Sequence, residues 1–177
     1  MHKLILYLKA SILALVLLVA LPISASSTEL RSPNKKVGLT LVGEGKDWYL
    51  QVDYKAAGVE KVLMPKVKLG LVRSDQDFSK ELKLLNVGKL KLINEKYTSI
   101  HGKRSERQNS ANELVFYFEN PNKAKINLIV RAYNDGVVFR YEFPEKTGTY
   151  IIQDELTAYE IQDSTLRWLQ KFDLSNE

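Results

Sequence analysis

The side chains that could carry out chemistry in this sequence are limited in kind. It has no cysteine and two histidines, and of these only His101 lies beyond the N-terminal segment. Thiol catalysis and cysteine-based metal sites are therefore excluded. Proton transfer at a sugar carbon, as in the aldose epimerases, is expected to need two histidines and a carboxylate, so that activity is excluded too. His101 precedes a polar loop, and we expect it to be solvated.

Carboxylates, in contrast, are plentiful, with 21 Asp and Glu residues in the chain. Cleavage of a glycosidic bond requires two carboxylates held at a defined separation across that bond. No motif in the sequence places two of them in such a relation. We therefore assign no catalytic and no cofactor-binding residue, and whether the chain is itself an enzyme stays open at this point.

The N-terminal residues have the composition of an export signal. Lys3 and Lys9 make the start basic, residues 10–23 are almost wholly apolar, and residues 24–27 are small. This pattern predicts a cleaved signal peptide over residues 1–27. A retained anchor helix is the alternative, although the apolar run is shorter than the ~20 residues of a membrane span. We expect an exported protein of the periplasm or cell surface, free of the membrane after cleavage, and the lack of cysteine suggests a bacterial source.

Residues 28–177 have the length of a single domain. The formal net charge of +5 is a mild excess, and the lysines are interleaved with acidic residues. No nucleic-acid module is recognisable, so we expect no nucleic-acid partner.

Alternation of apolar and polar residues predicts an all-β fold. Short alternating runs spaced about ten residues apart are typical of an antiparallel β-sandwich. Residues 75–85 are the one place where one or two helical turns are expected, and residues 102–112, which have no apolar side chain larger than Ala, are expected to form a solvated loop. The predicted strands are residues 35–43, 47–54, 59–64, 67–72, 87–93, 97–100, 113–119, 150–153 and 156–161, with Pro65 at an edge or bulge.

Residues 126–143 predict a β-hairpin around Asp135-Gly136, because both residues tolerate the positive φ of a two-residue loop. That register pairs Ala132 with Phe139 and makes one face wholly apolar, whereas a three-residue loop would set apolar side chains against charged ones. It also sets Arg131 opposite Arg140, where like charges repel. Either the two arginines are solvated and splay apart, or this face meets carboxylates, of which Glu142 is the nearest.

The hairpin Arg131–Phe143 also resembles the signature hairpin of the N-terminal domain of glycoside hydrolase family 97. Weaker matches occur in the family's order at residues 30–34, 111–114 and 154–157. The family comprises exported bacterial α-glucosidases and α-galactosidases. The resemblance implies a β-sandwich of the supersandwich, galactose-mutarotase-like type over residues 28–177.

The same resemblance implies a function for the chain. It would be the non-catalytic N-terminal domain, truncated or split from a (β/α)₈ barrel that carries the catalytic carboxylates. The implied partners are an α-linked oligosaccharide and a catalytic barrel domain, in cis or on a companion chain.

One metal ligand is implied by the family pattern near the end of the chain. Trp168, Phe172-Asp173 and Ser175-Asn176-Glu177 match it, with Asn176 where the family usually has an aromatic residue. Glu177 would then bind calcium together with barrel residues, because calcium takes six to eight oxygens. The alternative is a solvated C-terminal residue. Glu155 is expected to be a structural partner of Arg131 or Arg140.

Two other functions remain open. A free-standing carbohydrate-binding module would use exposed aromatic side chains, for which Trp48, Tyr49, Tyr54 and Trp168 are available. Tryptophan in a sandwich is, however, more often part of the core. A structural or interaction protein that docks through its arginine face is the third hypothesis.

Overall fold

The computed structural model describes residues 27–100, 105–145, 148–163 and 165–168, and every regular element in these ranges is a β-strand. The predicted all-β class is confirmed. Among these described residues there is no helix with the length and hydropathy needed to cross a membrane. The strands are β1 (Ser27–Arg31), β2 (Val37–Glu44), β3 (Asp47–Ala56), β4 (Val59–Lys68), β5 (Leu71–Arg73), β6 (Gln76–Asp77), β7 (Lys83–Val87), β8 (Lys91–Thr98), β9 (Glu106–Glu119), β10 (Lys125–Tyr133), β11 (Val137–Glu142), β12 (Ile152–Glu155) and β13 (Ala158–Tyr159).

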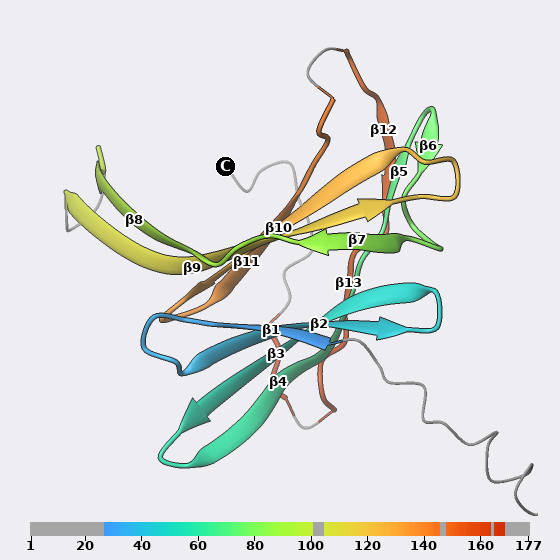
Figure 1. Ribbon diagram of the computed structural model, residues 1–177. Helices are drawn as coiled ribbons and strands as arrows, with labels where there is room; N and C mark the ends of the chain where they lie inside the picture. The colour runs from blue at the N-terminus through green and yellow to red at the C-terminus, as the bar shows by residue number, and fades with distance from the viewer. Residues whose placement is uncertain (1–26, 101–104, 146–147, 164, 169–177) are drawn as a thin grey trace, which may run out of the picture.

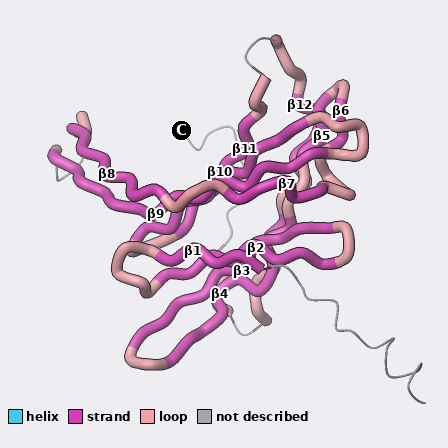
Figure 2. The backbone as a smooth tube through the Cα atoms, viewed as in Figure 1, coloured by secondary structure: helices cyan, strands magenta, loops and turns pink. Residues whose placement is uncertain are grey.

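Two antiparallel five-stranded sheets form the two layers of a sandwich (Figures 1 and 2). One has the order β1-β2-β3-β4-β13, and the other the order β11-β10-β9-β7 with β8 also paired to β9. A small third sheet, β12-β5-β6, continues from the end of β4. The last strands, β12 and β13, run back beside β5 and β4, so the C-terminal part of the described chain borders the first sheet.

The core lies between the two layers and follows directly from the alternation in the sequence. Leu39, Leu41 and Leu50 of the first sheet are at most 1% exposed, and Phe116 and Val130 of the second are fully buried. All five belong to one continuous hydrophobic cluster. Burying each such side chain stabilises the fold by roughly 1.5–3 kcal/mol, so this interface is the main source of stability.

The central hairpin has the predicted apolar face but a different register. The structure pairs Ala132 with Val137 and Val130 with Phe139, and the two-residue loop is Asn134-Asp135. The predicted register was therefore wrong by two residues. Side chains alternate with period two, so an even shift leaves the apolar face in place.

The position of this turn has a visible cause. The Oδ1 atom of Asn134 accepts a hydrogen bond of 3.0 Å from the backbone N–H of Asn34, which ties the tip of the hairpin to the loop between β1 and β2. Among the described glycines, those with positive φ are Gly45, Gly58 and Gly148, and Gly136 is not one of them. The turn therefore differs from the Asp-Gly preference and includes a residue that contacts a loop 100 positions away.

Two local predictions were wrong. Residues 75–85 contain β6 and the start of β7 instead of helical turns, and Asp77 accepts hydrogen bonds from the backbone N–H and the hydroxyl of Ser79 between them. Part of the predicted loop 102–112 belongs to β9, which begins at Glu106 and pairs with β8 as far as Thr98. Both strands are largely exposed there and extend away from the sandwich in Figure 1. Backbone pairing therefore forms this ribbon without an apolar face.

Pro65 lies where it was expected. It sits inside β4, in a stretch where the pairing with β3 shifts register between Leu50 and Val52. A proline has no N–H to donate, so an irregularity in the ladder is the position it tolerates best.

Candidate functional site

A cleft of about 650 Å³ lies between the two layers. Leu39, Leu50 and Met64 line it from the first sheet, and Phe139 and Tyr141 from the hairpin. Part of its wall is therefore the apolar face that the sequence predicted for residues 126–143.

The polar groups of this cleft lie on β11, β12 and β13. Arg140, Glu155 and Tyr159 are part of its lining. The hydroxyl of Tyr141 accepts a hydrogen bond of 3.0 Å from the backbone N–H of Gly70, and burial raises the pKa of this phenol. Tyr141 therefore stays neutral and fixes the hairpin against the start of β5.

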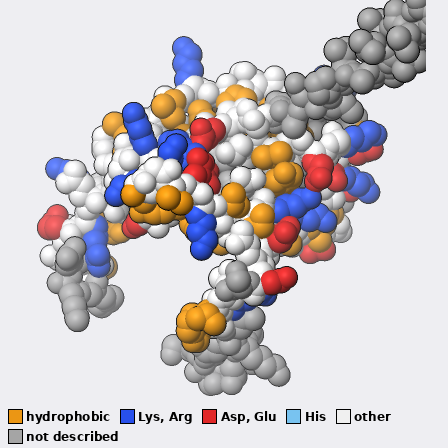
Figure 3. All heavy atoms as spheres, turned by 90° about the horizontal axis from the view of Figure 1, so that it is seen from below, with side chains coloured by type: hydrophobic (Ala, Val, Ile, Leu, Met, Phe, Trp, Pro, Cys, Tyr) orange, Lys and Arg blue, Asp and Glu red, His pale blue; other side chains and the backbone are white. Residues whose placement is uncertain are grey.

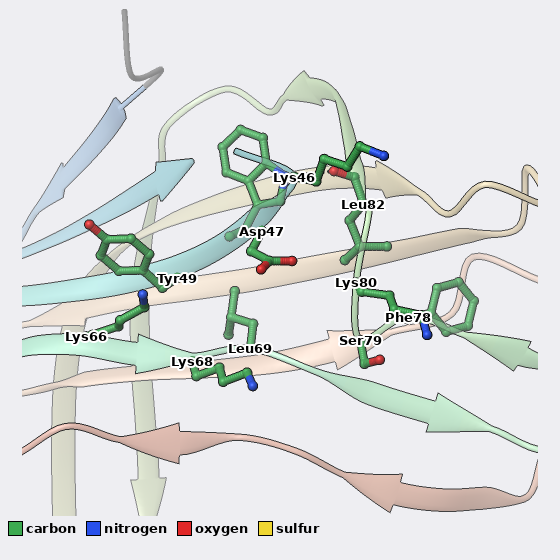
Figure 4. Close-up of a pocket in the computed structure, with 11 residues that line it drawn as sticks. Lys46, Asp47, Tyr49, Lys66, Lys68, Leu69, Phe78, Ser79, Lys80 and Leu82 are labelled. Carbon is green, nitrogen blue, oxygen red and sulfur yellow. Dashed lines mark hydrogen bonds between the residues drawn. The ribbon is translucent and has the colours of Figure 1, made fainter. Parts of the chain in front are cut away.

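A second hollow, of about 210 Å³, lies beside the β2–β3 turn (Figure 4). Tyr49 and Lys66 lie on one side of it and Lys80 on the other, and Asp47 projects between them. Most of the charges here are matched: Lys66 pairs with Glu44 at 2.6 Å, and other lysines of the lining pair with acids nearby. The full lining is Lys46, Asp47, Trp48, Tyr49, Lys66, Lys68, Leu69, Phe78, Ser79, Lys80 and Leu82.

Two of the four aromatic side chains expected to form a sugar platform are engaged at this hollow. Trp48 packs edge-on against Phe118 at 5.5 Å and donates a hydrogen bond of 2.8 Å from Nε1 to the carbonyl of Leu82. The Nζ atom of Lys66 lies 4.8 Å from the centre of the Tyr49 ring and covers it. Trp48 is therefore partly buried and packed against the core, and Tyr49 offers no free ring face on that side.

The other two aromatic side chains are exposed. Tyr54 is 37% exposed, and Trp168, near the end of the described chain, is 86% exposed. An isolated exposed ring does not make a sugar platform, so the aromatic groups give the binding-module hypothesis little support.

Three carboxylates, those of Glu29, Asp53 and Glu60, come within 4.8 Å of one another on the first sheet. This is a spacing that a cation could use, but the guanidinium of Arg31 contacts all three. Burial lowers the pKa of Arg31, but its hydrogen bonds to Glu60, Glu29 and Asp53 outweigh this and raise it. The group is therefore a structural ion network, and a second cation would be repelled by Arg31.

Sequence reasoning missed this network because its members lie up to 31 positions apart. One signal pointed to it: Gly38 lies on the face of β2 opposite the core, directly between Arg31 of β1 and Asp53 of β3. A Cβ atom at Gly38 would lie 2.4 Å from Oδ1 of Asp53 and 2.6 Å from Nη1 of Arg31. A glycine inside a strand often marks such a close approach.

Arg131 does not face Arg140, which corrects the predicted repulsion. It lies opposite Val138 and binds Glu113 at 2.6 Å and Glu95 at 2.8 Å. Hydrogen bonds to Tyr133 and Glu113 raise its pKa. The expectation that carboxylates meet this face is therefore right for Arg131, although the acids come from β9 and β8.

The acids expected beside the two arginines behave differently. Arg140 lies 3.4 Å from Glu142, the neighbour that was predicted. Glu155 was predicted to be a partner of Arg131 or Arg140, but its carboxylate accepts a hydrogen bond of 3.0 Å from the hydroxyl of Thr157 instead. Since β11 is shifted by two residues, the arginine pair that Glu155 was meant to neutralise does not exist.

A further arginine site was not predicted at all. Arg73 is 4% exposed and its guanidinium lies over the rings of Phe143 and Tyr150, at 4.6 and 3.9 Å from their centres. Asp75 binds it through two hydrogen bonds of 2.6 and 2.9 Å. This cation–π cage anchors the small third sheet to the end of the hairpin.

Two predicted residues, His101 and Glu177, lie outside the described residues. The calcium ligand assigned to Glu177 therefore stays a prediction, as does the solvation of His101. The signal peptide predicted for residues 1–27 falls almost wholly outside them as well.

Comparison with known proteins decides the family. A family profile described as "Glycosyl-hydrolase 97 N-terminal" matches residues 30–177. The chain belongs to glycoside hydrolase family 97. The resemblance inferred from the hairpin is confirmed, and the matched region is the N-terminal domain of that family, a non-catalytic domain.

Two relatives are more than 25% identical to this family 97 domain over the aligned residues. A "Probable retaining alpha-galactosidase" of Streptomyces bingchenggensis (strain BCW-1) is 28% identical over 176 residues, which cover 96% of the chain and 27% of the relative. The crystal structure of a beta-arabinopyranosidase is 27% identical with a TM-score of 0.68 and covers 76% of the chain and 21% of that protein.

A more distant neighbour shares the fold. A family 97 enzyme from Pseudoalteromonas sp. strain K8 is 22% identical with a TM-score of 0.65, over 77% of the chain and 20% of that protein. Its structures include complexes with panose and with acarbose. The family 97 domain described here thus spans between a fifth and about a quarter of the length of the proteins it resembles.

Proposed function

We propose that this family 97 domain supports hydrolysis of α-linked oligosaccharides by a (β/α)₈ barrel, in cis or on a companion chain. The observation that carries the proposal is the match of residues 30–177 to the N-terminal domain of a glycoside hydrolase family. The relatives are between three and four times as long as this chain, which leaves room in them for a separate catalytic domain. In this role the sandwich positions the barrel and borders its sugar site.

The relatives favour a substrate with the galactose configuration. One is named as an alpha-galactosidase and another as a beta-arabinopyranosidase. A β-arabinopyranoside of the L series has the ring configuration of an α-D-galactopyranoside and lacks only the exocyclic CH₂OH group. Both names therefore describe the same arrangement of ring hydroxyls and leaving group. The neighbour in complex with panose and acarbose is less similar in sequence and supports only the fold.

Calcium is part of the proposal through Glu177. The three clustered carboxylates of the described residues are held by Arg31, so they do not fit a calcium ion. A single carboxylate cannot hold calcium, which needs six to eight oxygens, so most ligands would come from the barrel. When bound, calcium would supply a positive charge at the sugar site, and Glu177 would contribute one oxygen to holding it there.

A domain exchange tests the proposal. The N-terminal domain of the Streptomyces relative would be replaced by residues 28–177, and turnover of nitrophenyl α-galactoside and α-glucoside measured beside a deletion that lacks the domain. We expect the exchange to restore α-galactoside turnover that the deletion loses, and Glu177→Gln to weaken its calcium dependence. A chimeric enzyme that folds but does not hydrolyse α-galactoside would refute the supporting role of the domain.

The isolated chain is the second arm of the experiment. It is expected to release no nitrophenol above the buffer control. Turnover by the isolated chain that Glu155→Gln or Glu177→Gln abolishes would show that the domain is catalytic and would overturn the proposal.

A further inference from the structure

The cleft between the layers is open on one side, and its rim is apolar. Val138, Ile152 and Tyr159 all line it, yet they are 49%, 47% and 55% exposed. Apolar groups gathered at the mouth of a hollow are typical of a surface that binds a partner. On the face seen in Figure 3, by contrast, charged side chains of both signs lie among the hydrophobic ones.

The opposite side of the sandwich is closed. β1 is the outer strand of the first sheet there, and the side-chain amide of Asn112 in β9 donates a hydrogen bond of 2.8 Å to the carbonyl of Arg31. Leu30 of β1 is 1% exposed as a result. The two layers therefore meet along β1 and β9, and the core is reached from outside along β11.

β11 has a free edge at this opening. It is the outer strand of the second sheet and is bonded only to β10 among the described residues. The N–H of Tyr133 donates to the carbonyl of Gly136, and hydrogen-bonded and non-hydrogen-bonded pairs alternate along the hairpin from there. By this alternation the N–H and C=O groups of Val137, Phe139 and Tyr141 point away from β10, where a further strand could pair with them.

Nothing within β11 blocks this edge. Outer strands of stable proteins usually carry lysines, a proline or a bulge that prevents further pairing. β8, which is bonded only to β9, has Lys91 and Lys96. β11 has the sequence VVFRYE, without lysine or proline, and its pairing with β10 runs without a shift of register. We therefore expect the edge to be paired in the assembled protein.

The strand is complementary to itself in one antiparallel register. A two-fold axis beside β11 runs perpendicular to the sheet, so residues on the same face of the strand must lie opposite each other. With Phe139 opposite Phe139 of a second copy, Val137 faces Tyr141 and every pair on the cleft side is apolar. On the outer side Val138 faces Arg140, so no two like charges are directly opposite.

The neighbouring registers fit less well. An axis at Arg140 would set two arginines directly opposite each other, where like charges repel. An axis at Val138 or Tyr141 lies next to an end of the six-residue strand and would pair only three of its residues with the second copy, whereas an axis at Phe139 pairs five.

We propose that a second copy of the chain covers the cleft, with its β11 added antiparallel to the free edge of β11 about a two-fold axis at Phe139. The two second sheets then form one continuous sheet. Both open mouths lie on the same side of this sheet, so that their apolar rims meet across the axis. This inference concerns the chain alone and stands whether or not the domain supports glycoside hydrolysis.

Sedimentation velocity of purified residues 28–177 is the first test. We expect a dimer that dissociates on dilution, with an elongated shape because the two copies meet edge to edge. A protein that remains monomeric up to its highest soluble concentration would overturn the proposal.

Substitutions at Val138 test the register through charge. Val138→Lys places a cation opposite Arg140 in both halves of the interface and should raise the Kd of the dimer severalfold, whereas Val138→Glu should lower it. Adding Arg140→Glu to Val138→Lys should restore the dimer, because opposite charges then face each other. Val59→Lys is the control, at a site 68% exposed and outside the cleft. Equal effects of the two lysine variants, or no recovery in the double variant, would contradict the register.

Disulfide formation supplies a test that does not depend on charge. The chain has no cysteine, so any disulfide must join two introduced residues. In the proposed register Val138 and Arg140 of the second copy form a non-hydrogen-bonded pair with Cα atoms about 4.5 Å apart, within the ~7 Å that a disulfide allows. Two copies of Val138, or two of Arg140, lie diagonally at about 8 Å.

A mixture of Val138→Cys and Arg140→Cys chains should therefore form a disulfide-linked dimer on oxidation, and neither variant should do so alone. Failure of the mixture to crosslink, or equal crosslinking of each variant by itself, would refute the proposed pairing.

Two other occupants of the cleft are distinguishable. A strand from a companion catalytic chain would leave residues 28–177 monomeric, and Val138→Lys would weaken their complex with the catalytic region of the Streptomyces relative. An oligosaccharide would bind saturably to monomeric protein when a galacto- or malto-oligosaccharide is added. Either result would overturn the pairing of two copies.

Discussion

Replacing Arg31 with methionine should destabilise the domain far more than replacing Arg140 with methionine. Methionine keeps most of the apolar length of the arginine side chain and removes its charge and hydrogen bonds. Asp53, whose residue is 3% exposed, would then remain buried beside two other carboxylates without a cation between them. The comparison isolates the loss of the guanidinium from the loss of packing.

The magnitude follows from the burial of the pair. Removing one partner of a buried ion pair costs roughly 3–5 kcal/mol, because the other charge is left uncompensated. Arg31 keeps 23% of its side chain exposed, so the lower end, about 3 kcal/mol, applies here. For a domain of this size each kcal/mol shifts Tm by about 2–4 °C, which gives a fall of roughly 6–12 °C. Arg140 is 63% exposed at its side chain, and an exposed pair contributes under about 1 kcal/mol.

The effect should depend on pH in a defined direction. Burial raises the pKa of Asp53 even with Arg31 present, and Arg31 opposes that rise. Without Arg31 the pKa of the folded carboxyl rises further above its unfolded value. Such a group contributes most to stability when protonated, and that contribution is lost as pH rises through the folded pKa. The deficit of Arg31→Met should therefore be larger at neutral pH than at about pH 5.

Thermal unfolding followed by circular dichroism, at both pH values, provides the measurement. Wild type, Arg31→Met and Arg140→Met would be compared at equal concentration and ionic strength. Equal Tm values for the two variants, or a deficit of Arg31→Met that grows as pH falls, would refute the account of a buried carboxylate held by Arg31.

Three further outcomes are expected. Gly38→Ala should lower Tm by several degrees because its Cβ would lie 2.4 Å from a carboxylate oxygen, while Gly136→Ala, with nothing within 4 Å, should leave Tm unchanged in the same melts. Leu128→Ala, at a site 2% exposed, should cost about 2–5 kcal/mol in urea unfolding, and Leu92→Ala, at 58% exposure, under about 0.5 kcal/mol. Millimolar calcium should not shift the Tm of the isolated chain, and Glu177→Gln should not change this; a clear calcium-dependent rise in wild type would contradict it.

The elements that the sequence predicts well are those in which one face is buried. Leu39, Leu41 and Leu50 alternate with polar residues, and each is at most 1% exposed. Both ends of β8 fall within the predicted strands 87–93 and 97–100, but the first half of β9 was missed because it has no buried face. Its polar residues are held by backbone pairing with β8 and by hydrogen bonds between side chains, such as that from Ser110 to Asn94, and alternation carries no information about such pairing.

The hairpin shows where a local rule reaches its limit. The pattern of side chains predicts which residues of the hairpin share a face, and with it the apolar face that contains Val130 and Phe139. The position of the turn does not, because a shift of two residues preserves that pattern. The turn lies one residue earlier than the Asp-Gly preference indicated, where Asn134 contacts Asn34, and in this register Arg131 binds Glu113 and does not face Arg140.

The charged sites illustrate why the candidate site could be predicted only in part. Arg31, Asp53 and Glu60 converge from β1, β3 and β4, and their convergence depends on the order of strands in the sheet. Composition shows that acids and bases are present but not which of them meet. Gly38 was the one indication of the network in the sequence. A glycine inside a strand often marks a place where a large group approaches the backbone. In this domain the glycine on the outer face of β2 therefore marks the ion network, which the charged residues alone do not.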